Sequence, residues 1–409
     1  MLISVTVYNE DVVFQKKDKT MKRIFAFLLV MGILLSITPT FAQSSSEIPL
    51  LVSTYGKIYK WVDTELVELV TGEGYSYSPD YNPEGTQFVY RTWSQITLDF
   101  AKAQETENGE FFWEGELPTD IAIYDLATDA YTIVSSQPNN ADPETLLRAV
   151  RRSAPKWSPD GTKLAWSEVF PVLDEDGNFA EIYSLVVYDI TTATTQVIAE
   201  GLPPAMIYSI PHDIQWGKEG LYLQIFNYIE DRAGEQFIYY PLVAGNGGYN
   251  VFFDADEANP TSISTFVTTY NDKEVFAVSY PNGTLRLISD EGQYEDLLGA
   301  APMKYNSLTA DGLANSMVVV NGNNSLSYTV TNPETQFQEI LIDNAYSFEG
   351  IQISPDGASV AYIDWNTGAV NIWKNMEIIT ISAPLDEFGN PSYINDITWG
   401  NQAYRIIQS

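Results

Sequence analysis

Residues 156–166, KWSPDGTKLAW, decide the fold class. Pro159 presets the backbone for the second position of a tight turn, Asp160 can bond its own backbone, and Gly161 takes the positive φ that closes a hairpin. The flanking residues alternate between apolar and polar, which is typical of half-buried strands. The phrase returns at residues 353–362, ISPDGASVAY. The sequence therefore predicts a β-hairpin that recurs along the chain.

Weaker copies of the hairpin occur between and around these two. They lie at residues 81–90, 216–223, 270–277, 308–320 and 397–406. After most copies comes a third strand and then a fourth, as at residues 121–126 and 130–134. Four strands per repeat is the unit of a β-propeller blade, which buries its faces by stacking on neighbouring blades. We therefore expect an all-β protein, a β-propeller of four-stranded blades.

The two ends of the repeat region complement each other. The last copy, at residues 397–406, supplies an inner hairpin with no strands after it, whereas residues 49–70 supply outer strands with no hairpin before them. Pairing the N-terminal and C-terminal strands makes one composite blade and removes the open sheet edges. This count gives seven blades, with six as the alternative because the copy at residues 270–277 is poor.

The Ser-Pro-Asp-Gly phrase resembles the Pro-Asp variety of WD-like repeat, found in the propeller of TolB-like proteins and in dipeptidyl peptidase IV-like proteins. The resemblance covers about residues 48–409, which we expect to be a single propeller domain. It implies a propeller used for binding. The peptidases place catalysis in a separate hydrolase domain, and no G-x-S-x-G motif occurs in this chain, so the resemblance implies no peptidase activity.

The N-terminal region reads as a targeting signal. Lys22 and Arg23 precede an apolar run that ends at small residues before Gln43, as in a secretory signal peptide at residues 21–42. Residues 1–20 are then an upstream artefact. We expect export to the periplasm or the extracellular space, with a retained N-terminal anchor as the alternative. The chain has no cysteine, which excludes thiol catalysis and thiolate metal sites.

The formal net charge of −33 limits the classes of molecule that the protein can bind. Such a protein repels nucleic acid and anionic lipid, so we expect no nucleic-acid partner and no membrane contact beyond a retained anchor. The same charge would favour cations or basic partners, or it would serve only to keep the protein soluble. We expect a monomer.

The residues that carry chemistry are few. His212 is the single histidine, so a histidine metal cluster is excluded, and we assign His212 a structural, funnel-lining or binding role. We expect a non-catalytic protein without a cofactor. The alternative is a carboxylate-dependent glycosidase or lyase with its site in the central funnel. Residues 174–178, DEDGN, with Glu181 beyond them, fit either a partial calcium loop or an exposed Asp-Gly hairpin.

Long segments interrupt the repeat in the first three blades, and long loops on a rigid scaffold are usually functional. We predict loops at residues 94–119, 137–154, 169–180, 201–210 and 228–236. They would form a rim that binds a protein, peptide or glycan. The expected binding residues there are Phe111, Phe112, Trp113, Arg148, Arg151 and Arg152. The alternative is that the aromatics tuck under their own loop and the arginines neutralise nearby acids.

Overall fold

The computed structural model divides the chain into Met1–Glu47 and Ile48–Ser409. All described elements belong to the second unit, and the expected signal at residues 21–42 lies outside the described residues. The description covers residues 48–400 except 55, 106–115, 203–212, 230–231, 243–248, 255–263, 271–272, 281–283, 290, 299–301, 306–315, 321–325, 333–334, 343–349, 356–358, 365, 375–376 and 387–388.

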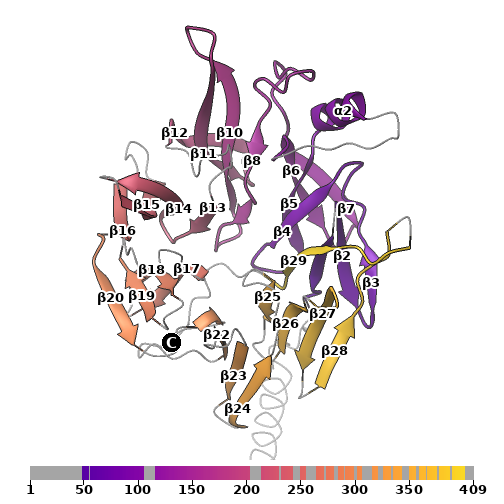
Figure 1. Ribbon diagram of the computed structural model, residues 1–409, viewed down its shortest axis with the longest axis vertical. Coiled ribbons are helices and arrows are strands. Elements are labelled where there is room, and N and C mark those ends of the chain that lie inside the picture. Colours follow the sequence, from indigo (N-terminus) through magenta and orange to yellow (C-terminus); the bar gives the residue numbers. More distant parts are fainter. Residues whose placement is uncertain are drawn as a thin grey trace, which may run out of the picture. The chain divides into compact units, whose positions relative to one another are not determined.

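Within the described residues the strands form seven antiparallel sheets, numbered here in chain order (Figure 1). Sheet 1 runs β29 (Ile394–Thr398), β1 (Leu51–Thr54), β2 (Lys57–Val62), β3 (Glu65–Glu68). Sheet 2 runs β4 (Ser76–Tyr81), β5 (Gln87–Trp93), β6 (Thr119–Asp125), β7 (Ala130–Ser135). In sheet 3, β8 (Arg151–Arg152) and β9 (Lys156–Trp157) both pair with β10 (Lys163–Leu173), which β11 (Phe179–Asp189) and β12 (Thr194–Glu200) follow.

The remaining sheets repeat the same order of four strands. Sheet 4 contains β13 (Asp213–Trp216), β14 (Gly220–Ile229), β15 (Arg232–Pro241) and β16 (Tyr249–Asp254). Sheet 5 contains β17 (Ser264–Tyr270), β18 (Lys273–Ser279), β19 (Thr284–Ile288) and β20 (Tyr294–Leu298). Sheet 6 contains β21 (Pro302–Tyr305), β22 (Ser316–Val320), β23 (Leu326–Asn332) and β24 (Thr335–Ile342). Sheet 7 contains β25 (Ile351–Ile353), β26 (Ser359–Asp364), β27 (Ala369–Lys374) and β28 (Glu377–Ile381).

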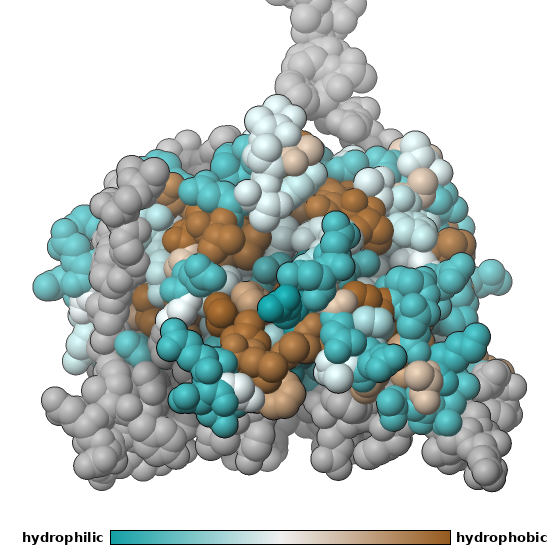
Figure 2. All heavy atoms as spheres, turned by 90° about the horizontal axis from the view of Figure 1, so that it is seen from above, coloured by the Kyte–Doolittle hydropathy of each residue, from teal (hydrophilic) through white to brown (hydrophobic). Residues whose placement is uncertain are grey.

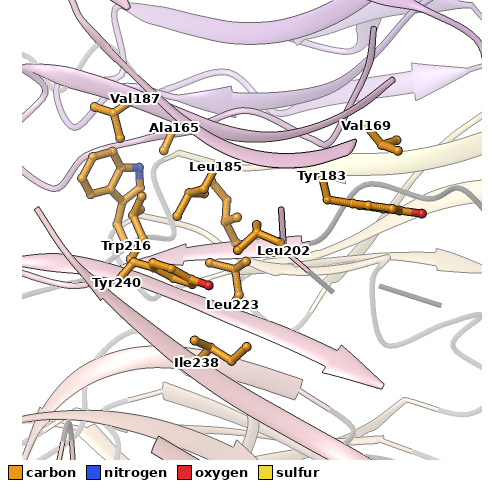
Figure 3. Close-up of a cluster of buried hydrophobic side chains, with 12 residues drawn as sticks. Ala165, Val169, Tyr183, Leu185, Val187, Leu202, Trp216, Leu223, Ile238 and Tyr240 are labelled. Carbon is orange, nitrogen blue, oxygen red and sulfur yellow. The ribbon is translucent and has the colours of Figure 1, made fainter. Parts of the chain in front are cut away.

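Successive sheets share buried apolar cores, because neighbouring residues of one strand point to opposite faces. In β10, Leu164 and Trp166 pack against sheet 2, whereas Ala165 packs against sheet 4. Figure 3 shows the core between sheets 3 and 4, where Leu185 and Leu223 belong to facing sheets. Similar cores lie between sheets 1 and 2, sheets 4 and 5, and sheets 7 and 1. Stacked four-stranded meanders of this kind define a propeller-type all-β fold.

The repeated phrase forms the predicted turn. Ser158 is buried, and its Oγ accepts a hydrogen bond from the Lys163 backbone N–H at 2.9 Å and donates one to Asp160 Oδ1 at 2.7 Å. Gly161 has a φ of 68°. Ser354 accepts from the Ser359 N–H in the same way, also at 2.9 Å. The serine hydroxyl of each turn is therefore satisfied locally, as a buried polar group must be.

Residues beside these turns join one sheet to the next. Asp80 Oδ2 accepts a hydrogen bond from the Trp157 backbone N–H at 2.9 Å, and Asp80 Oδ1 lies 3.5 Å from Lys156 Nζ. Trp216 Nε1 donates to the Lys156 carbonyl at 2.9 Å.

The expected pairing of the chain ends is present in part. β1 pairs with β29 through partners such as Val52 and Ile397, so sheet 1 takes one strand from the C-terminal end and three from the N-terminal end. The rest of the expected C-terminal hairpin, at residues 401–406, lies outside the described residues.

Candidate functional site

The candidate site is the rim, which we define as the described part of the segment at residues 94–118 (94–105 and 116–118), the segment at residues 136–150 and the β10–β11 hairpin at residues 169–183. The first segment contains an unexpected helix, α2 (Gln95–Gln104). Ser94 caps it by accepting a hydrogen bond from the Thr97 backbone N–H at 3.3 Å. No helix among the described residues is long and apolar enough to cross a membrane.

The rim segments at residues 94–118 and 136–150 share a small apolar core of their own. Phe100 of α2 packs with Leu117, Leu146 and Ala149, all of them buried. Gln137 ties the second segment down, because its Nε2 donates to the Thr119 and Val150 carbonyls and its Oε1 accepts from the Val150 N–H at 2.7 Å. The described parts of these long connections are therefore packed against the protein.

Two residues in this second segment have left-handed backbones without being glycine. Leu146 has a φ of 57° and Arg148 a φ of 61°. Such conformations cost about 1–3 kcal/mol each and persist where the surroundings impose them, most often at functional sites. Arg148 is also joined to the hairpin, because its backbone N–H donates to the Pro171 carbonyl at 2.9 Å.

The β10–β11 hairpin corrects the expectation of a loop at residues 169–180. Both strands continue through most of this range, with register pairs from Val169 and Tyr183 to Leu173 and Phe179. The expected loop at residues 228–236 is likewise mostly strand, since β14 ends at Ile229 and β15 begins at Arg232. At residues 169–180 the polar DEDGN turn favours a loop, although the apolar residues on both sides of it extend the two strands.

The hairpin ends in an exposed apolar pair. Leu173 and Phe179 are partners across the two strands, and they are 51% and 73% exposed. Figure 2 views the molecule from the top of Figure 1, where β8, the hairpin and α2 lie, and it shows hydrophobic side chains gathered there among hydrophilic ones. Large apolar side chains held in the open in this way are typical of interaction sites.

Residues 174–178 close the hairpin as a compact Asp-Gly turn. Asp174 Oδ1 accepts hydrogen bonds from the backbone N–H groups of Asp176 at 2.9 Å and Asn178 at 2.7 Å, and Gly177 has a φ of 82°. The bond from Asn178 is the main reason that the pKa of Asp174 lies below its ordinary value. Among the described residues no group of three or more side chains forms a metal cluster. Calcium binding stays an untested prediction.

Arg152 lies in the seam between sheets 2 and 3 and is 3% exposed. Its Nε donates to Glu168 Oε1 at 2.9 Å, and its Nη2 donates to the Ser136 carbonyl at 3.0 Å. Its Nη1 donates to the Thr119 carbonyl. Glu168 Oε1 also accepts from Trp166 Nε1 at 2.8 Å. One guanidinium therefore holds the ends of both rim segments against sheet 3.

The three predicted rim arginines do not form one cluster, because adjacent strand residues face opposite ways. Arg151 points toward the seam with sheet 4, where its Nη2 lies 2.5 Å from Glu181 Oε1. Tyr183, a member of that core, donates its hydroxyl to Glu181 Oε2 at 2.9 Å. Arg148 has an exposed side chain. Arg151 and Arg152 thus have acidic partners within the protein, as the neutralising alternative expected, while Arg148 remains accessible.

Arg91 is a further cation that the sequence did not single out. Its Nη1 donates to Glu116 Oε2 at 3.0 Å and to the Arg152 carbonyl at 2.9 Å. Its guanidinium carbon lies 4.4 Å from the centre of the Tyr77 ring. Burial raises the pKa of Tyr77 to about 12, so this phenol is neutral at ordinary pH. Arg91 therefore joins the end of the first rim segment to the same seam as Arg152.

Three carboxylates in or beside the rim pair with these arginines. Glu116, Glu168 and Glu181 each bind one of them. Burial raises the pKa of Asp80. This carboxyl joins the inner strands of sheets 2 and 3, so it does not belong to the rim. Phe111, Phe112, Trp113 and His212 lie outside the described residues.

Comparison with known proteins assigns no family, because no family model and no curated protein matches the chain. Among solved structures, a puromycin-hydrolyzing peptidase of Mycobacterium tuberculosis is 13% identical, with a TM-score of 0.48, over 80% of this chain and 49% of the peptidase. This chain thus spans about half the length of the peptidase. An oligogalacturonate lyase of Vibrio parahaemolyticus is 12% identical, with a TM-score of 0.46, over 84% of this chain and 94% of the lyase.

A nidogen/laminin complex is 11% identical, with a TM-score of 0.37, over 86% of this chain and 97% of the matched chain. At TM-scores below 0.5 these likenesses assign neither an activity nor a ligand to this protein.

Proposed function

We propose that this protein is an exported, monomeric and non-catalytic propeller that binds a protein partner through its rim. The observation that carries the proposal is the exposed pair Leu173 and Phe179 at the end of the hairpin. Each Å² of apolar surface left in water forgoes about 25 cal/mol of burial energy, so a partner that covers the pair would gain affinity from it.

The proposed ring has seven blades, closed by the composite sheet 1. The seven sheets of the described residues and the pairing of β1 with β29 support this arrangement. The cores shared by successive sheets support it as well. A closed ring has no free sheet edges, which gives its rim a rigid base.

The fixed geometry of the rim also supports a binding role. Arg148 joins the hairpin to the neighbouring segment, and the ion pair of Arg151 on β8 with Glu181 on β11 holds the hairpin in place. A partner that meets a rigid surface loses less conformational entropy on binding than one that must order a loop. The apolar character of the tip favours a protein over a glycan.

The test compares the wild-type protein with the double variant Leu173→Ser/Phe179→Ser. The control is Val197→Ser, because Val197 is 55% exposed and lies on β12 of the same sheet. Proteins captured from an extract of the native source are quantified by mass spectrometry, and the affinity of the recovered partner is then measured with pure proteins. We expect the double variant to bind at least about tenfold more weakly, since two anchors are lost. Equal affinity of the double variant and the control contradicts the proposal.

A further inference from the structure

Arg148 differs from the other three arginines described in and beside the rim. Arg91, Arg151 and Arg152 each form an ion pair with a glutamate of the same chain. Arg148 forms no ion pair with any residue that the structure describes, and it is exposed. The chain contains 54 acidic residues and 21 lysines and arginines, so carboxylates are plentiful. An arginine that has none of them as a described partner departs from the pattern of its neighbours.

Two aspartates of the rim bind other groups. Asp142, which lies in the same segment as Arg148, accepts a hydrogen bond from the Thr145 hydroxyl at 2.6 Å and another from a backbone N–H. These bonds, the one from Thr145 foremost, hold the pKa of Asp142 below its ordinary value. Asp174, at the end of the hairpin, accepts from two backbone N–H groups. Both carboxylates are therefore stabilised without the guanidinium of Arg148.

The backbone fixes Arg148 beside the exposed apolar pair. Its N–H donates to the Pro171 carbonyl at 2.9 Å, and Pro171 lies two residues before Leu173 on β10. Two residues of a strand span about 7 Å, a distance that an extended arginine side chain can cover. Leu173 in turn is the cross-strand partner of Phe179. A partner that covers the apolar pair therefore comes within reach of the guanidinium.

The chemistry of the guanidinium decides what that partner must offer. Arginine carries N–H donors in a planar fork and no acceptor, and a carboxylate matches two of these donors at once. A partner that removes water from Arg148 without supplying an acceptor pays a desolvation cost, whereas the low local dielectric strengthens an ion pair. The negative charge of the whole chain acts weakly here, because charges beyond about 8 Å are screened at physiological salt.

We propose that Arg148 binds a carboxylate of the partner protein, an Asp or Glu side chain next to the apolar residue that covers Leu173 and Phe179. The inference rests on the proposed rim-binding function and adds to it the chemistry by which the partner is selected. The apolar pair supplies an anchor that many apolar segments would fit. Arg148 then distinguishes among them, because only a segment with an acid at the right place satisfies its donors.

The first experiment selects random peptides displayed on phage. The selection is run on the wild-type protein, on Arg148→Glu and on Leu173→Ser/Phe179→Ser. We expect the wild-type protein to enrich peptides with an apolar residue close to Asp or Glu. Arg148→Glu should enrich the same apolar residue close to Lys or Arg, because the charge that the peptide meets is reversed. The variant without the apolar pair should enrich neither class.

The second experiment measures affinity by isothermal titration calorimetry. The most enriched peptide is compared with a copy in which Asp or Glu is replaced by its amide, and both peptides have amidated C-termini. The wild-type protein should bind the acidic peptide at least about tenfold more tightly, the value of a hydrogen bond to a charged group. Arg148→Ala should bind the two equally, although its backbone N–H can still bond Pro171. The control Lys218→Ala removes an exposed cation between β13 and β14 and should keep the preference.

Two results overturn the inference. One is equal affinity of the wild-type protein for the acidic and the amide peptide, and the other is a preference for the acidic peptide that persists in Arg148→Ala. Failure of the rim proposal looks different. If the wild-type protein enriches an apolar motif that lacks an acid and that Leu173→Ser/Phe179→Ser no longer selects, the rim function stands and the role of Arg148 does not. If no enriched motif depends on the apolar pair, both fail.

Discussion

The two ends of sheet 3 differ in how they treat their side chains. At one end the turn buries the Ser158 hydroxyl and satisfies it by hydrogen bonds with Asp160 and the Lys163 N–H. At the other end the strands β10 and β11 run on as a hairpin and leave Leu173 and Phe179 in solvent. The first end satisfies its own buried hydroxyl, whereas the second end leaves apolar side chains in water that the proposed partner would cover. Under the proposed function, the repeat builds the scaffold and the departures from the repeat bind the partner.

The largest expected effect lies between these two ends, at Arg152. Replacing Arg152 with Leu removes the cation that pairs with Glu168 and one donor each from the Thr119 and Ser136 carbonyls in a buried seam. We expect the free energy of unfolding to fall by about 3–5 kcal/mol, because removing one partner strands the other. Urea unfolding measures the change. Arg148→Ala is the control, and its exposed side chain predicts a change within about 0.5 kcal/mol. Equal effects of the two variants would show that the seam does not hold the rim.

The next largest effect is a change in the free energy of unfolding with pH, caused by Asp80. Burial raises its pKa above the ordinary 3.8, and Lys156 offsets part of the increase. The folded state therefore holds the proton more tightly than the unfolded state. The contribution of Asp80 to stability is complete below pH 3.8 and falls as pH rises through the folded-state pKa, by at most about 1.4 kcal/mol per pH unit.

The variant Asp80→Asn removes this titration. The difference in unfolding free energy between wild type and Asp80→Asn should therefore decrease as pH rises from about 3.8. Chemical unfolding of both proteins over a series of pH values measures it. A difference that stays constant or increases with pH contradicts the assignment of burial as the dominant cause.

At the turn end of the sheet we expect a smaller change in the free energy of unfolding. Ser158→Ala removes the acceptor of the Lys163 N–H, and Ser354→Ala removes the acceptor of the Ser359 N–H. Each variant should lose about 1 kcal/mol, the net value of such a hydrogen bond. Ser136→Ala is the control, since Ser136 is exposed. Thermal unfolding of all three variants ranks them. A stable Ser158→Ala protein would mean that the turn needs only its proline and glycine.

The hairpin end predicts the smallest change in stability. Leu173→Ser/Phe179→Ser alters side chains that are already in solvent, so the unfolding free energy should move by no more than about 0.5 kcal/mol. Urea unfolding beside Val197→Ser checks this. A loss of several kcal/mol would show that the pair packs within the protein, and the contrast between the two ends of the sheet would disappear.

The scaffold was more predictable than the rim because its signals are local. Proline, aspartate and glycine in one turn, followed by alternating apolar residues, specify the hairpin at Ser158 within a few positions. The pairing of β1 with β29 followed from counting incomplete repeats at the two ends. These features depend on the backbone and on the period of the strand, which a sequence displays directly.

The rim depends on contacts between distant segments. The helix α2 was not predicted, because the segment was treated as a loop between two strands. Its one local signal is Ser94, which caps the helix by accepting from the Thr97 N–H. The grouping of Arg148, Arg151 and Arg152 as one patch was a matter of sequence proximity, whereas strand alternation sends Arg151 and Arg152 to different seams. Their acidic partners come from β10 and β11, and no spacing rule connects them to β8.

The central claim is that the hairpin end of sheet 3 binds a partner and that the rest of the surface of sheet 3 does not. The most direct measurement is photo-crosslinking in an extract of the native source, with p-benzoylphenylalanine placed at Phe179 in one protein and at Val197 in another. Both side chains are well exposed, at 73% and 55%. Crosslinking of a defined partner from position 179 but not from position 197 is the predicted result. The same products from both positions, or none from position 179, would contradict it.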